Sequence, residues 1–133
     1  MAGYTKLNLI EDVDDSAPKF GMAPAIEAHF ARDDIGAEKF GLSYQRLAPD
    51  ARMPFGHTHS EQEEVYVIVG GSGRVKVDDD VHEIEQWDAV RVSAGAMRNF
   101  EAGADGLEYV AFGAPNTGGK DVEMVQGWWP EEE

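Results

Sequence analysis

Two histidines one residue apart are the strongest chemical signal in the chain. His57 and His59 lie in a stretch that we expect to be extended, and side chains two residues apart on a strand point to the same face. Glu64 follows them, directly before the apolar run 65–69. Two imidazoles and one carboxylate form a ligand set for a divalent transition metal: Fe, Mn, Ni, Zn or Cu. We therefore predict His57, His59 and Glu64 as metal ligands.

The neighbouring acid, Glu63, is the rival ligand. We prefer Glu64 because Tyr66 and Ile68 follow it at two-residue spacing, which would place all three on one inward face of a strand. In this interpretation residues 71–73, Gly-Ser-Gly, form the turn after the strand.

This stretch resembles the first motif of the cupin family, H-x-H-x(3,4)-E-x6-G. His57, His59, Glu64 and Gly71 match the motif, whereas Ala51 stands where the family has an earlier glycine. The resemblance covers residues 40–115 and implies an all-β fold, an antiparallel jelly-roll barrel with the site inside its mouth. It also implies a small-molecule ligand, and many small cupins are dimers.

The second cupin motif, G-x5-P-x-G-x2-H-x3-N, is only partly matched by residues 87–100. Gly95 keeps its place. The departures are Trp87 for a glycine, Ser93 for a proline, and Arg98 for the histidine that is the family's fourth metal ligand. A guanidinium group cannot ligate a metal, because it stays protonated and offers no lone pair.

Three arrangements of Arg98 are therefore open. Its side chain turns away from the site, an anion lies between it and the metal, or the site is metal-free and Arg98 pairs with Glu64 or holds a ligand carboxylate. We expect a protein that binds one divalent transition metal in the barrel and binds or acts on a small anionic molecule. If it is an enzyme, the resemblance implies a metal-dependent oxygenase or isomerase. The alternatives are a metal-free binding or sensor module, and a stability or interaction protein whose barrel is only a scaffold.

Short apolar and alternating segments must position these residues. We expect strands over 26–32, 40–46, 65–69, 74–77, 81–84, 89–92 and 107–112, with a turn at Asp78–Asp80 and a glycine-containing connection at 101–106. Many short strands with turn residues between them are typical of a sandwich or barrel. Residues 1–25 are acidic and interrupted by proline, so we expect an irregular N-terminal arm before a barrel domain over 26–133.

Strand alternation also gives candidates for the lining of a ligand pocket. We predict that the side chains that join Arg98 in this lining are Tyr44, Arg46, Tyr66 and Phe100. The two remaining histidines, His29 and His82, are predicted to be strand residues without a role as ligands.

Composition narrows the class of protein. The chain has 133 residues, 42% of them hydrophobic, no cysteine and a formal charge of −15, which fits one globular domain without disulfides. Such acidity disfavours nucleic acid and anionic membranes as partners, because both need basic patches. No apolar run is long enough for a membrane helix and no signal peptide is evident, so we expect a cytoplasmic protein. Acidic clusters such as 131–133 are interpreted as solvated.

Two adjacent tryptophans, Trp128 and Trp129, lie beside the acidic C-terminus. Each carries a large apolar surface that is costly to expose. Three placements are open: on the outer sheet of the same domain, across a homodimer interface, or over the barrel mouth. We expect a homodimer.

Overall fold

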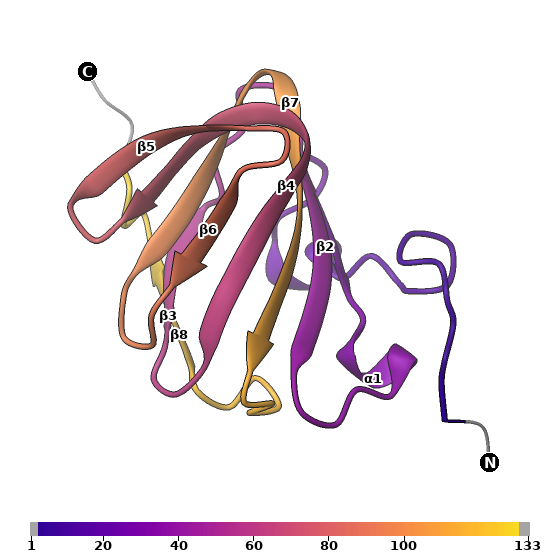
Figure 1. Cartoon of the computed structure of the whole chain (residues 1–133). Coiled ribbons are helices and arrows are strands. Elements are labelled where there is room, and N and C mark those ends of the chain that lie inside the picture. The colour runs from indigo at the N-terminus through magenta and orange to yellow at the C-terminus, as the bar shows by residue number, and fades with distance from the viewer. Residues whose placement is uncertain (1–2, 131–133) are drawn as a thin grey trace.

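The computed structural model describes residues 3–130, so the first two residues of the expected arm and the acidic cluster 131–133 lie outside it. A 3-10 helix η1 (Ala17–Phe20) and one short α-helix accompany eight strands, which curl around a central space (Figure 1). The elements after η1 are β1 (Ile26–Phe30), α1 (Arg32–Ile35), β2 (Gly41–Leu47), β3 (Phe55–His59), β4 (Glu63–Val77), β5 (Asp80–Glu85), β6 (Ala89–Val92), β7 (Arg98–Ala114) and β8 (Val122–Gln126).

All strand pairs are antiparallel, and the two longest strands, β4 and β7, organise the sheet. Strand β4 pairs with β5, β6 and β7, whereas β7 also pairs with β2 and β3. Strand β1 lies beside β2, and β8 lies beside β3. The predicted all-β, barrel-like architecture is confirmed. Within residues 3–130, no helix has the length and apolar character needed to cross a membrane.

Two expected connections are continuous strand instead. Residues 71–73 lie within β4, and residues 101–106 lie within β7, where the pairing is irregular. The reason is the close approach of the two strands. Gly71 has a φ of +71°, and a Cβ there would lie 2.0 Å from the Gly106 carbonyl oxygen. Glycine thus permits a bulge and a bend at this crossing, and our prediction of turns was wrong.

An aromatic cluster fills the centre of the core and lies beside the site. The ring centroids of Tyr66 and Phe100 are 4.6 Å apart, and those of Phe100 and Tyr109 are also 4.6 Å apart. All three side chains are buried. They come from the inward faces of β4 and β7, so the longest strand pair supplies the rigid floor of the central space.

The N-terminal arm is irregular, as predicted, but it is packed. Val13, Ala17 and Met22 are buried, and Asp15 forms an isolated bridge with His29 of β1. Ala17 and Met22 belong to the same hydrophobic core as the strands, so this part of the arm packs as part of the barrel. The domain boundary proposed at residue 26 stays a prediction.

The C-terminal tryptophans pack on their own chain. Trp129 is buried, and the Arg52 guanidinium lies 4.3 Å from its ring centroid. Trp128 covers Gly56, where a Cβ would come within 2.6 Å of the indole ring. Of the three placements considered, the first is observed. The homodimer stays a prediction, and these tryptophans no longer motivate it.

Candidate metal site

Strand β3 holds both histidines toward the central space. Phe55, His57 and His59 share one face of this strand, which pairs with β8 along its length and with β7 at His57 and Arg98. The backbone N–H of Gly95 donates a 2.7 Å hydrogen bond to the carbonyl of His59 and so fixes this strand from the adjoining turn. Gly95 has a φ of +87°, which explains the glycine at this position.

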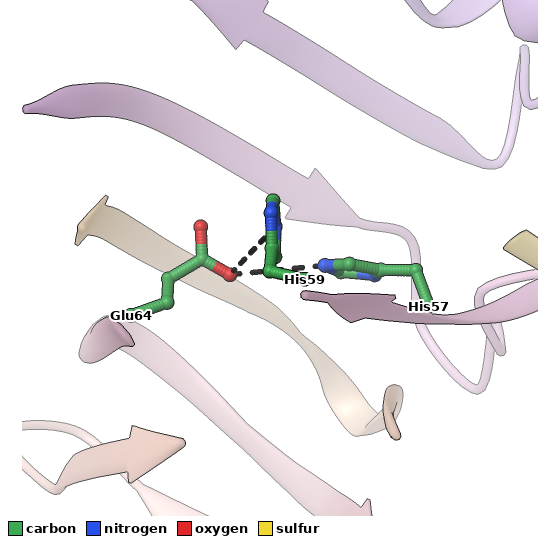
Figure 2. Close-up of side chains that lie close together, drawn as sticks. All are labelled: His57, His59 and Glu64. Atoms are coloured by element: carbon green, nitrogen blue, oxygen red, sulfur yellow. Dashed lines mark ion pairs between the residues drawn. The ribbon is translucent and has the colours of Figure 1, made fainter. Parts of the chain in front are cut away.

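The three predicted ligands converge on one point (Figure 2). The Nε2 atoms of His57 and His59 each lie 3.7 Å from the same oxygen of Glu64, Oε1. The ligand atoms of this group all lie within 4.8 Å of one another. Ligand bonds of about 2.0–2.2 Å to a metal imply separations of roughly 3–3.5 Å between neighbouring donor atoms, so small side-chain adjustments would close the group around one ion.

Asp121 fixes the orientation of the His59 ring. Its Oδ1 lies 3.1 Å from Nδ1 of His59, and the carboxylate also accepts hydrogen bonds from Thr117 and from the backbone N–H of Gln62. Burial would raise the pKa of Asp121, but these hydrogen bonds outweigh it and hold the pKa well below its usual value. A carboxylate at Nδ1 favours the tautomer that presents a lone pair at Nε2, as metal-binding histidines need.

Charge states in the site also favour metal ligation. Burial, reinforced by the positive charge of Arg98, lowers the pKa of His57 and favours its neutral form. Burial would raise the pKa of Glu64, but His57 and Tyr66 outweigh it, and the pKa is lowered overall. The Tyr66 hydroxyl, whose pKa is raised by burial, donates a hydrogen bond to Glu64. Neutral imidazoles and an ionised carboxylate are the forms that bind a metal.

Arg98 points inward. Its side chain is fully buried, Nη1 donates a 3.4 Å hydrogen bond to the carbonyl of His57, and Nη2 lies 4.0 Å from Oε1 of Glu64. The arrangement in which Arg98 turns away from the site is therefore not the one observed. The rival acid, Glu63, points outward and pairs with Arg91 at 3.0 Å.

A cavity of about 430 Å³ opens above the three ligands. Tyr66, Phe100 and Arg98 are among the residues that line it, and their role in ligand binding stays a prediction. Tyr44 and Arg46 are not among the lining residues, because the opposite face of β2 points inward and contributes Ser43 and Gln45. Tyr44 instead donates a hydrogen bond to Glu108, and Arg46 is exposed.

Sequence reasoning missed Asp121, Gln62, Ser43 and Gln45. Asp121 directly precedes β8. We did not predict this strand, although Val122, Met124 and Val125 give the segment an apolar content that a short strand could have. The partner of Asp121, His59, is distant in sequence, so no local spacing indicated the contact. His82 is exposed on β5, and His29 contacts the N-terminal arm, so neither lies in the group of His57, His59 and Glu64.

No protein-family model and no curated protein matches the sequence. Solved structures do match. A cupin protein from Bacteroides fragilis, BF4112, has a TM-score of 0.71 at 21% identity and covers 88% of each chain. A variant of Pac13 from Streptomyces, solved with uridine, has a TM-score of 0.72 at 13% identity, covering 95% of this chain and 93% of that one.

A variant of oxalate decarboxylase from Bacillus subtilis matches with a TM-score of 0.76 at 17% identity. The match covers 95% of this chain but only 33% of the decarboxylase. These similarities show that the chain has the cupin fold. At these identities they show the fold alone, so the substrates of these proteins do not transfer to this chain.

Proposed function

We propose that this protein binds one divalent transition metal through His57, His59 and Glu64, and binds a small molecule in the cavity above it. The observation that carries the proposal is the convergence of two Nε2 atoms, each 3.7 Å away, on one carboxylate oxygen. The contact between Nδ1 of His59 and Asp121 supports it, because histidines that ligate a metal typically donate their other ring N–H to a carboxylate or carbonyl group.

The donor set and the cavity limit the chemistry. Two nitrogens and one oxygen suit Fe, Mn, Ni, Zn or Cu. These ions take four or more ligands, so three protein ligands leave positions open for water or a small molecule. Such an ion, when bound, would act as a Lewis acid or activate water. The chain itself would orient Glu64 through Tyr66 and His59 through Asp121. The aromatic cluster of Tyr66, Phe100 and Tyr109 would shield the ion on one side.

The proposal extends to a reaction only as a class. If the protein is an enzyme, metal-assisted oxidation or isomerisation of a small molecule fits an open metal site in a largely apolar cavity. Structural neighbours are consistent with small ligands: Pac13 is described as a nucleoside dehydratase. The homodimer and the cytoplasmic location are further proposals that rest on the sequence.

A second candidate function is metal-free ligand binding. Arg98 favours it, because a guanidinium 4.0 Å from Glu64 gives the carboxylate a counter-charge without any metal. In that case the group His57, His59 and Glu64 would act as a hydrogen-bonding surface for a ligand.

Metal titration of histidine variants separates the two functions. Zinc binding, followed by calorimetry on protein without an affinity tag, should reach about one ion per chain. His57→Ala and His59→Ala should each abolish it, whereas His82→Ala, a histidine variant on exposed β5, should bind as the wild type does. Equal loss in all three variants would place the site elsewhere, and no binding by the wild type would favour the metal-free function.

A further inference from the structure

Arg98 is buried with two unused hydrogen-bond donors. Nε and Nη2 have no hydrogen-bond partner in the described part of the chain, although the side chain is 0% exposed. The acidic oxygen beside Nη2, Oε1 of Glu64, is 4.0 Å away and beyond hydrogen-bonding distance. Unpaired donors on a buried charge are costly, and in native proteins they indicate a partner such as an ion, a water or a ligand.

We propose that Arg98 anchors the carboxylate of a small ligand whose apolar part lies against the hydrophobic wall of the cavity, and that metal and carboxylate strengthen each other's binding. This inference rests on the proposed metal site and names the class of ligand that the site takes.

The geometry of the free donors suits a carboxylate. Nε and Nη2 form one edge of the planar guanidinium, where two N–H bonds point the same way and match the two oxygens of a carboxylate. Nη1, on the other side, is already used by the His57 carbonyl. Neighbouring side chains cover both free nitrogens, so a ligand carboxylate reaches them only if one of these side chains moves aside. Glu64 is the acidic side chain next to the two nitrogens.

Charge balance favours an anion over a water molecule and explains the coupling. Without a metal, the negative charge of Glu64 offsets that of Arg98 across 4.0 Å. With a divalent ion at neutral histidines, the same carboxylate would face three positive charges. A ligand carboxylate would restore part of the balance, so each partner should raise the affinity of the other by the same factor.

The cavity wall defines the rest of the ligand. Its apolar lining includes Met22, Met53, Phe55, Phe100 and Met124. A volume of about 430 Å³ lies in the range of small-molecule sites, which run from about 300 to 1,000 Å³. Of the charged side chains in the lining, Glu64 and Arg98 lie beside the two histidines, whereas Arg32 and Asp33 of α1 pair with each other. The ligand should therefore carry its charge at the end that reaches Arg98. An aromatic or aliphatic carboxylic acid has this form, whereas a ligand charged along its length does not.

The test uses benzoate as the probe. Benzamide is its neutral counterpart, and acetate carries the carboxylate without the apolar ring. Each is titrated by NMR into zinc-loaded and zinc-free protein. In zinc-loaded wild type we expect benzoate to bind at least about tenfold more tightly than benzamide or acetate, as a charge-assisted pair of hydrogen bonds predicts. Zinc should raise benzoate affinity.

Arg98→Met keeps an unbranched apolar stem and removes the charge. We expect it to retain zinc and to bind benzoate at least about tenfold more weakly. Arg98→Lys keeps the charge without the paired donors, should fall between the two, and carries the test if the methionine variant fails to fold. Arg91→Met, an exposed arginine on β6, is the matched control and should behave as wild type.

The outcomes separate the two proposals. Zinc binding with equal affinity for benzoate and benzamide, or unchanged benzoate affinity in Arg98→Met, overturns the anchor and leaves the metal site standing. Benzoate binding that is lost in Arg98→Met while wild type takes up no zinc keeps the anchor but overturns the metal site and the coupling. Absence of both zinc and benzoate binding overturns both.

Discussion

At the scale of single residues, the site depends on contacts that hold the ligands rather than on the ligands alone. Asp121 receives hydrogen bonds from Thr117 and the backbone of Gln62, and it faces Nδ1 of His59 from the far side of the ring. Tyr66 holds Glu64 in the same way. Each supporting residue therefore has a measurable effect on the metal without touching it.

Asp121→Asn should weaken zinc binding by about 10–100-fold, the usual cost of losing a partner behind a histidine ligand. The amide cannot accept all of these hydrogen bonds, so the free energy of unfolding of the metal-free protein should also fall by about 1–3 kcal/mol. Calorimetric zinc titration and chemical denaturation measure the two effects. Asp105→Asn, at an exposed position in β7, is the control, and equal zinc affinity in both variants would contradict the role of Asp121.

Trp87 stands where the cupin motif has a glycine, and the backbone conformation at this position explains why a glycine suits it. It has a φ of +74°, a left-handed conformation that a side chain disfavours, and it is 71% exposed. Trp87→Gly should therefore stabilise the protein by about 1 kcal/mol, measured by thermal or chemical denaturation. Trp87→Ala removes the indole but keeps a Cβ, so it should bring no such gain. A gain of equal size in both variants would show that the backbone is not the cause.

At the scale of secondary-structure elements, local pattern predicted where strands occur better than where they end. The alternation at 40–46 and the apolar run 65–69 correspond to parts of β2 and β4. The glycines of β4 and β7 looked like turns because their role, close approach of two distant strands, has no local signature. The face of β2 was misassigned for a similar reason: Tyr44 is buried, as an inward residue would be, but on the other face of the sheet, where its ring lies beside His29 of β1.

The candidate ligands could be predicted because they share one short segment with strand alternation. Asp121 could not, because it reaches His59 through the pairing of β3 with β8. Arg98 was identified as the departure from the family pattern, but its inward orientation is set by its register opposite His57.

The packing of the arm on β1 depends on His29. Its Nδ1 lies 2.6 Å from the Val13 carbonyl, and its Nε2 lies 2.8 Å from Glu27, so both contacts are hydrogen bonds when both ring nitrogens are protonated. Burial would lower the pKa of His29, but the contacts with Glu27 and Val13, aided by the charge of Asp15, outweigh it and raise the pKa. A raised pKa means that this stabilisation is complete below about pH 6.5 and is lost as pH rises through the folded-state value.

His29→Phe should therefore lower the free energy of unfolding by about 1–3 kcal/mol at pH 6, with a smaller difference from wild type at pH 8.5. Urea denaturation at the two pH values measures both differences, and His82→Phe on exposed β5 is the control. A difference that grew toward alkaline pH would have the wrong sign for a protonated His29.

At the scale of the whole molecule, the cupin fold places the group His57, His59, Glu64 and Arg98 in the wall of a cavity that is otherwise largely apolar. The formal charge of −15 repels anions, so binding of an anionic ligand needs a local positive charge. Arg98 and a bound metal would supply it.

Acid should release the metal. The pKa of His57 and the pKa of Glu64 are both lowered, so each group stabilises the site above its unfolded-state value and loses that contribution as pH falls. We expect bound zinc to be lost between roughly pH 6.5 and 4.5, with the loss concentrated toward the acidic end because His57 resists protonation. Dialysis at stepped pH followed by zinc analysis measures this. Loss already complete at pH 7.5, or full retention at pH 4, would contradict it.

Elemental analysis of wild-type protein, purified without an affinity tag and desalted, tests the metal site most directly. The structure predicts about one transition-metal ion per chain, present on purification or taken up after exposure to Fe, Mn, Ni, Zn or Cu, and less than about a tenth of an ion in His59→Ala. A wild type that retains less than about a tenth of an ion with every one of these metals would contradict the account.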